Sequence, residues 1–248
     1  MTGRPALGLL VLLLPLAGCG SDGDGGDAEG ELTVLAASSL IDVYQDLAAG
    51  FEEDNQADVT FSFGSSTDLA GQAADGAPGD VLSTADATSM QAAEDAVVTG
   101  EVVEFATNVM VIVTPADNPA GIESLDDLVG ATWVRCADAI PCGRVAQAVL
   151  EANQITADPV SLEEDARATL DKVVSGEAEA GMVYASDAVA AGEGVETVEI
   201  PEAEEELTTY FTTTLEQSDD TDLAQAWVDL VTSEEGRATL TEAGFTLP

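Results

Sequence analysis

Apolar and polar positions follow two alternating periods along most of the chain. Runs such as ELTVLAA (31–37) and ADVTFSF (57–63) have the apolar or two-residue patterns of strands, whereas residues 38–54 place apolar side chains at helical spacing. A third strand-like run, GDVLSTAD (79–86), is again followed by a helical run. This order predicts an α/β fold with a mostly parallel sheet and crossover helices.

Two long strand-like runs divide this pattern into clusters. FATNVMVIVTP (105–115) and ELTTYFTTTL (206–215) each separate one group of strand–helix units from another. We therefore predict two lobes joined by a two-strand hinge, each lobe a mixed sheet flanked by helices. The expected bounds are residues 31–108 with 208–248 for lobe 1 and residues 109–207 for lobe 2.

The first nineteen residues have the features of a targeting signal. Arg4 precedes an apolar run, Ala6 to Leu16, that is too short to span a membrane as a stable helix. The run ends in the sequence LAGC, which resembles the lipobox of bacterial lipoproteins. That resemblance implies a signal peptide over residues 1–18, a lipidated Cys19 and anchoring to the extracytoplasmic face of the cell membrane. An ordinary secretory signal with an incidental cysteine is the alternative.

The charge balance is strongly acidic. The chain has 48 Asp and Glu residues, 6 Lys and Arg residues and no His, and its formal net charge is −42. Nucleic acid is excluded as a partner, because phosphate backbones need clustered basic residues. Residues 19–30 are rich in Gly and Asp and are expected to form a flexible acidic tether. The acidity is interpreted as a solvated surface suited to a salty milieu, with cation binding as the alternative.

Two cysteines remain beyond the leader, Cys136 and Cys142, in the run CADAIPC. Outside the cytoplasm a close pair favours a disulfide. The competing interpretation, a zinc site, would need carboxylate ligands, because the chain contains no His.

The sequence contains none of the common arrangements of catalytic residues considered below. A Ser–His arrangement is impossible without His, and Lys172, the only lysine, has no Ser three residues before it. No glycine-rich nucleotide loop follows a strand. We therefore expect a binding protein without a cofactor, and not an enzyme.

Small or hydroxyl residues mark several strand-to-helix junctions: Ser38-Ser39, Ser65-Ser66-Thr67, Pro141-Cys142-Gly143 and Asp165-Ala166. Each junction offers unpaired N–H groups and the positive end of a helix dipole. A single Ser at such a place is usually an N-cap. Several junctions that converge on one cleft would instead form an anion site.

The runs LTVLAASSLIDVYQDLAAGFE, FSFGSSTDLAGQAADGAPGDVLSTAD and AGMVYASDAVAAG, with the terminal EEGRATLTEAGF, resemble the molybdate-binding proteins of bacterial ABC importers. That resemblance implies a two-lobed, type II periplasmic-binding-protein-like fold closing on a tetrahedral oxyanion held by neutral donors. Molybdenum or tungsten would enter only as the oxyanion, with no metal bound directly. The implied oxyanion-binding residues are Ser39, Ser66, Cys142, Ala166 and Tyr184. Cys142 stands where better-known members have a small alanine, and the Cys136–Cys142 pair departs from those members.

The resemblance implies a monomeric, lipid-anchored receptor that binds molybdate or tungstate and passes it to the membrane permease of an ABC importer. A receptor for another oxyanion such as sulfate, and an acidic cation-binding surface lipoprotein, are the alternatives. Tyr184 could instead be a core residue with its hydroxyl on a backbone carbonyl. We expect Arg144 and Arg167 on exposed helix faces, outside direct contact with the anion, and Thr67 to cap its helix.

Overall fold

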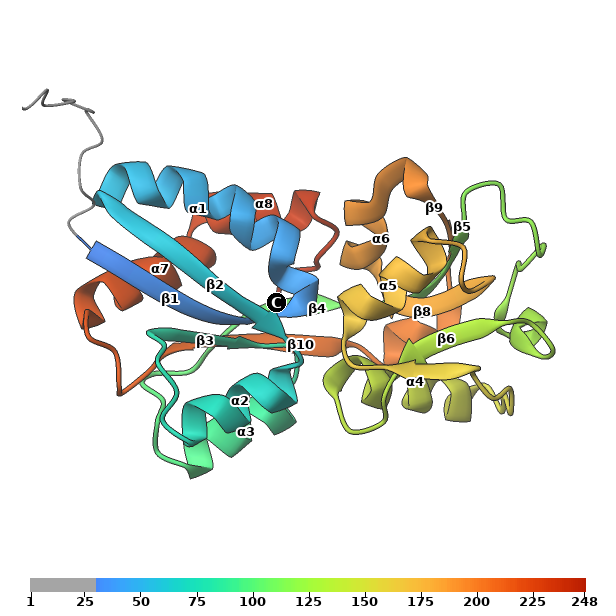
Figure 1. The fold of residues 1–248 in the computed structure, drawn as a ribbon, viewed down its shortest axis with the longest axis horizontal. Helices are drawn as coiled ribbons and strands as arrows, with labels where there is room; N and C mark the ends of the chain where they lie inside the picture. The colour runs from blue at the N-terminus through green and yellow to red at the C-terminus, as the bar shows by residue number, and fades with distance from the viewer. Residues whose placement is uncertain (1–29) are drawn as a thin grey trace, which may run out of the picture.

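The chain folds into two mixed five-stranded sheets with helices on both faces (Figure 1). The computed structural model describes residues 30–248. The predicted signal peptide, the lipidated Cys19 and residues 19–29 of the tether therefore lie outside the described residues. The two sheets and their helices confirm the predicted two-lobed α/β class.

The first sheet has the strand order β2-β1-β3-β10-β4. Strand β1 pairs in parallel with β2 and β3, and β10 pairs antiparallel with β3 and β4. The strands are β1 (Gly30–Ala37), β2 (Ala57–Gly64), β3 (Val81–Thr84), β4 (Val103–Asn108) and β10 (Thr208–Thr214). The helices of this lobe are α1 (Ile41–Asn55), α2 (Ser66–Ala74), α3 (Ala87–Asp95), α7 (Thr221–Thr232) and α8 (Glu234–Glu242).

The second sheet has the strand order β7-β6-β8-β5-β9. Strand β6 is parallel to β7 and β8, and β5 is antiparallel to β8 and β9. The strands are β5 (Met110–Pro115), β6 (Trp133–Cys136), β7 (Ser161–Glu163), β8 (Ala180–Tyr184) and β9 (Val195–Val198). The helices are α4 (Pro141–Ala152), α5 (Ala166–Val174) and α6 (Ala185–Ala191), and short 3-10 turns are η1 (Ser38–Leu40), η2 (Leu125–Leu128), η3 (Gly192–Gly194) and η4 (Pro201–Glu205).

Each sheet is covered on both faces, so each lobe has two apolar layers. In the first lobe one layer packs against α1, α7 and α8 and the other against α2 and α3. In β5, Met110 and Ile112 belong to one layer, and Val111 and Val113 belong to the other. This division follows from the two-residue period of a strand, which turns successive side chains to opposite faces.

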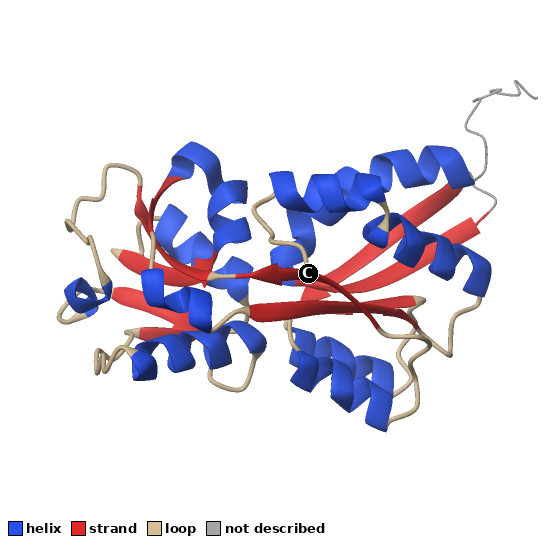
Figure 2. Cartoon of the chain, turned by 180° about the vertical axis from the view of Figure 1, so that it is seen from behind, coloured by secondary structure: helices blue, strands red, loops and turns tan. Residues whose placement is uncertain are grey.

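Two segments of the chain connect the lobes, and neither of them is one continuous strand through both sheets. The run 105–115 is divided at Val109 into β4 and β5, which belong to different sheets. Strand β10 lies wholly in the first sheet, and the chain returns to it through η4 (Figure 2). Periodicity did not locate the break, because apolar residues lie on both sides of Thr107 and Asn108 and the run has the pattern of one strand.

Local helix signals agree with the structure at several junctions. Ser233 caps α8 by accepting a hydrogen bond from the Gly236 N–H at 3.1 Å, as is usual for a serine directly before a helix. Helix α4 begins at Pro141, because proline suits the first turn of a helix. Within residues 30–248, no helix is both long and apolar enough to cross a membrane.

Candidate anion-binding site

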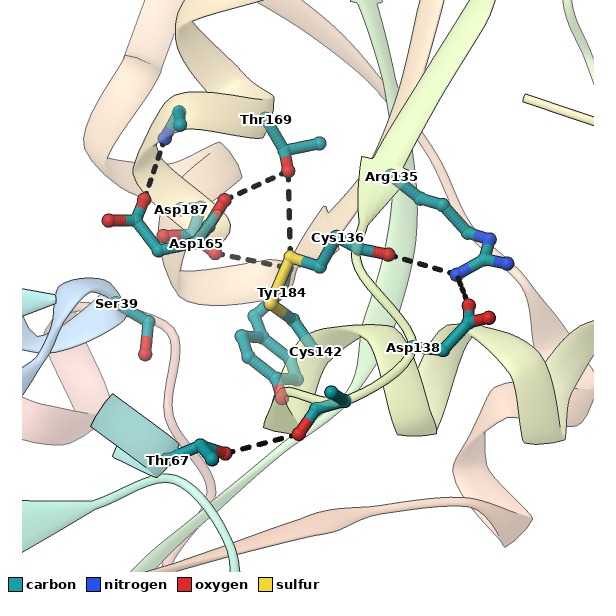
Figure 3. Close-up of a disulfide and its surroundings, with 12 residues drawn as sticks. Ser39, Thr67, Arg135, Cys136, Asp138, Cys142, Asp165, Thr169, Tyr184 and Asp187 are labelled. Atoms are coloured by element: carbon teal, nitrogen blue, oxygen red, sulfur yellow. Dashed lines mark hydrogen bonds and ion pairs between the residues drawn. A yellow bond between two sulfur atoms is a disulfide. The ribbon is translucent and has the colours of Figure 1, made fainter. Parts of the chain in front are cut away.

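A small cavity lies between the lobes, and all five residues expected to bind the oxyanion line it. The cavity volume is about 10 Å³, which is about the space that one water molecule occupies, so the lobes are closed tightly around it. Ser39 and Ser66 come from the first lobe, and Cys142, Ala166 and Tyr184 come from the second. Figure 3 shows Tyr184 and Cys142 beside the first-lobe residues Ser39 and Thr67. Each of the five residues stands at or just before the start of a helix.

The first lobe presents two buried serine hydroxyls to the cavity. The Ser39 Oγ, in η1, hydrogen-bonds the Tyr210 hydroxyl at 2.8 Å. The Ser66 Oγ, at the first residue of α2, accepts a hydrogen bond from the Ala85 N–H at 2.9 Å. Because Ser66 already accepts from the backbone, its hydroxyl proton remains available to a ligand.

The helix cap at this junction differs from the prediction. The Ser65 Oγ accepts a hydrogen bond from the Asp68 N–H at 3.2 Å, so Ser65 is the N-cap of α2. The Thr67 hydroxyl donates to the Ala139 carbonyl of the second lobe at 3.2 Å. The expectation that Thr67 caps the helix is therefore wrong. Three consecutive hydroxyl residues made the position of the cap ambiguous in the sequence.

The disulfide between Cys136 and Cys142 is present, as predicted, and it joins the end of β6 to the first turn of α4. Gly143 permits a close approach in the same turn, since a Cβ atom there would lie 1.8 Å from the Ala137 carbonyl oxygen. The first N–H groups of a helix have no partner within the helix. The disulfide and Gly143 therefore hold this set of donors beside the cavity.

Helix α5 begins at the cavity in a similar way. The Asp165 Oδ1 accepts a hydrogen bond from the Ala168 N–H at 2.8 Å and caps the helix, and Ala166 is its first residue. Asp165 itself also lines the cavity. Its carboxylate is therefore the one negative charge among the lining residues, which otherwise carry only neutral groups.

Tyr184 lies at the end of β8 with its side chain buried, and its hydroxyl has no hydrogen-bond partner. The alternative that its hydroxyl bonds a backbone carbonyl is therefore not realised. Burial raises the pKa of Tyr184 well above its ordinary value, so the phenol keeps its proton. An unpaired buried hydroxyl is unfavourable, and an anion in the cavity would supply the acceptor.

Two arginines connect the lobes across the cleft. Arg144 of α4 forms an ion pair with Asp86 before α3, and Arg167 of α5 forms an ion pair with Asp42 of α1. The expectation of arginines on exposed helix faces is wrong, because both side chains are only partly exposed and are paired. Neither arginine lines the cavity. The sequence carried no signal for these pairs, since each joins residues distant in the chain.

A buried carboxyl lies close behind Tyr184. The Asp187 Oδ2 accepts a hydrogen bond from the Tyr184 N–H at 3.0 Å, and its Oδ1 has no partner. Burial raises the pKa of Asp187 to about 7, although the Tyr184 N–H and the positive charge of Arg167 lower it. The carboxylates of Asp165 and Asp42 raise it further.

Replacing Asp187 with asparagine is expected to change how stability depends on pH. The unfolded chain releases this proton near the ordinary carboxyl pKa, whereas the folded chain keeps it until about pH 7. The carboxyl therefore destabilises the fold increasingly as pH rises through this window, and its contribution is constant above it. Relative to the parent, Asp187→Asn should gain up to about 4 kcal/mol between about pH 4 and about pH 7.

Urea unfolding of both proteins across this window would measure the difference, because all other titrating groups are shared. A stability difference that does not change with pH would contradict the raised pKa of Asp187.

The described part of the chain offers no metal site. Among residues 30–248, no group of three or more Cys, Asp or Glu side chains is placed to hold a metal ion. The cation-binding alternative therefore rests on composition alone.

Comparison with known proteins decides the family. Residues 32–246 match the family described as bacterial extracellular solute-binding protein. The chain belongs to this family. This membership confirms the expectation of a binding protein rather than an enzyme. Members of the family are described as extracellular, so the protein binds its solute outside the cytoplasm.

The solute-binding protein is similar to named relatives over nearly its whole length. It is 35% identical to the molybdate-binding protein ModA of Mycobacterium tuberculosis, covering 96% of this chain and 95% of the relative. The fold resembles the periplasmic molybdate-binding protein of Azotobacter vinelandii, with a TM-score of 0.79, 19% identity and coverage of 88% and 99%.

The fold also resembles the sulfate-binding protein SubI of Mycobacterium tuberculosis, with a TM-score of 0.73, 17% identity and coverage of 87% and 86%. The architecture is therefore shared by receptors named for different oxyanions. Discrimination between such ligands has to come from the residues around the cavity.

Proposed function

We propose that this solute-binding protein binds molybdate or tungstate through Ser39, Ser66, Cys142, Ala166 and Tyr184. The observation that carries the proposal is the meeting of these residues, from both lobes, around one small cavity. The similarity to proteins named as molybdate-binding supports the choice of oxyanion. The lobes in this proposal are residues 31–108 with 208–248 and residues 109–207.

The lining fits a fully deprotonated oxyanion. Hydroxyl groups, a phenol and helix N-termini offer hydrogen atoms, and the one charged lining side chain, the Asp165 carboxylate, accepts a hydrogen bond from the Ala168 N–H as the cap of α5. Hydrogen bonds to a charged group are stronger than those between neutral groups, and helix starts add the favourable end of their dipoles. In this proposal the serine hydroxyls and the phenol donate from their side chains, and Cys142 and Ala166 donate from their backbone N–H groups.

Titration calorimetry with a panel of ligands tests the proposal. Purified protein should bind one equivalent of molybdate or tungstate tightly, and bind sulfate and phosphate much more weakly. Calcium serves as the probe for the cation-binding alternative. Tighter binding of sulfate than of molybdate would favour the sulfate receptor, and saturable binding of calcium alone would favour the acidic surface lipoprotein.

We further propose that the bound oxyanion is delivered to the membrane permease of an ABC importer, from a protein anchored by a lipid on Cys19. The LAGC sequence at the end of the apolar leader supports the anchor. A lipid anchor would keep the receptor close to the permease at the cell surface.

Replacing Cys19 with serine is expected to release the protein from the membrane fraction, because serine cannot carry the thioether-linked lipid. Cell fractionation followed by mass spectrometry of the N-terminus would measure this. Ser21→Ala, two residues further on, is the matched control and should stay membrane-bound. A Cys19→Ser protein that fractionates like the parent would show that the anchor is absent or lies elsewhere.

A further inference from the structure

Tyr210 lies directly behind Ser39 and outside the set of lining residues. Its hydroxyl and the Ser39 Oγ are 2.8 Å apart, and both side chains are buried. The two residues are 171 positions apart in the sequence, and Tyr210 comes from β10. The phenol of Tyr210 therefore contacts a proposed donor to the anion without lining the cavity itself.

The ring of Tyr210 is held by aromatic neighbours. Phe245 and Phe105 pack edge-on against it, with centroids 5.2 and 6.1 Å away. The ring of Tyr184, from the other lobe, makes a third edge-on contact at 6.2 Å. These contacts fix the position of the Tyr210 ring and its hydroxyl. The hydrogen bond to Ser39 therefore costs little additional side-chain entropy.

The direction of this hydrogen bond determines whether the Ser39 hydroxyl can donate its proton to the anion. A serine hydroxyl has one proton, and an oxyanion can only accept. If Ser39 donated to Tyr210, its lone pairs would face the anion and repel it. If Tyr210 donates to Ser39, the serine proton is free to point into the cavity.

The buried phenol is suited to be the donor of the pair. At 2.8 Å either hydroxyl could donate, but a phenol is more acidic than the aliphatic hydroxyl of serine and is therefore the better donor of the two. Burial raises the pKa of Tyr210 above its ordinary value, so the phenol has its proton to donate. A hydroxyl that accepts a hydrogen bond becomes a stronger donor in turn, because successive bonds in a chain polarise one another.

We propose that Tyr210 is a positioning residue for oxyanion binding: its hydroxyl donates to the Ser39 Oγ and thereby directs the Ser39 proton to the ligand. The inference rests on the proposed function. It assigns to β10 of the first lobe a part in ligand affinity, although β10 contributes no residue to the lining.

A double-mutant cycle on molybdate affinity tests the inference. Tyr210→Phe should weaken binding about two- to tenfold, the range for one neutral hydrogen bond. In a Ser39→Ala background the same change should have almost no further effect, because the group through which Tyr210 acts is gone. Calorimetry on the parent, both single variants and the double variant gives the coupling free energy between Tyr210 and Ser39 in molybdate binding.

Tyr44→Phe is the matched control. The Tyr44 hydroxyl donates to the Ser83 Oγ at 2.8 Å, and this pair is equally buried in the first lobe. Ser83 does not line the cavity, so the variant should lose stability without losing affinity.

Two results would overturn the inference: parent-like affinity in Tyr210→Phe, or an equal loss of affinity with and without Ser39. If Tyr210→Phe did not fold, the Tyr210 hydroxyl proton of the parent provides the second measurement. Its NMR resonance should move downfield on saturation with molybdate, and an unchanged resonance would contradict the inference. A parent that binds none of the oxyanions would instead refute the proposed function, and the inference with it.

Discussion

Ser66→Ala is expected to weaken molybdate binding about ten- to a hundredfold, because a hydrogen bond to a charged group contributes about 1.5–3 kcal/mol. Ser39→Ala should have an effect of the same size. The two losses need not add, since the anion can shift within a partly emptied site. Isothermal titration gives the affinities, and thermal melts of the unliganded variants give their stabilities.

Ser66 also stabilises the fold, because its Oγ accepts a hydrogen bond from the Ala85 N–H. Ser66→Ala should therefore lose about 1 kcal/mol of stability as well as affinity. Ser233→Ala is the matched control, since Ser233 caps α8 away from the cavity. It should lose about 1 kcal/mol of stability and keep its affinity. If Ser39→Ala and Ser66→Ala behave like Ser233→Ala, the serines are structural and the proposed site is wrong.

Tyr184→Phe is expected to lower the affinity for molybdate without lowering the stability of the unliganded protein. The variant should bind molybdate about ten- to a hundredfold more weakly, because the phenol would lose its hydrogen bond to the charged ligand. The unliganded variant should melt at the same temperature as the parent or higher. The reason is that the Tyr184 hydroxyl is buried without a partner, so its removal breaks no bond within the protein.

Melting curves with and without molybdate would measure both effects on Tyr184→Phe. Stabilisation by the ligand should shrink with the affinity, since it depends on ligand concentration relative to Kd. A variant that loses unliganded stability but binds as tightly as the parent would identify Tyr184 as a packing residue.

Several structural features of this protein can be predicted from residues that are close to one another in the sequence. The alternation of strands and helices, the capping of α8 by Ser233 and the disulfide between Cys136 and Cys142 were all predictable. The physical reason is that periodicity, capping and a short cysteine loop each involve groups within a few residues of one another. Ser39 and Tyr184 could be named only through the resemblance to a known family, because hydroxyls at helix starts are usually caps.

The way in which these strands and helices come together depends on long-range contacts. Whether helix starts converge depends on strand order and on the lobe connection at Val109, neither of which periodicity reveals. The pairing of Arg144 with Asp86 follows from the approach of the two lobes. The strand–helix units and the chemical groups at their ends follow from local sequence alone. The contact of Tyr210 with Ser39 required the folded chain, because β10 reaches the first sheet only after the second lobe is complete.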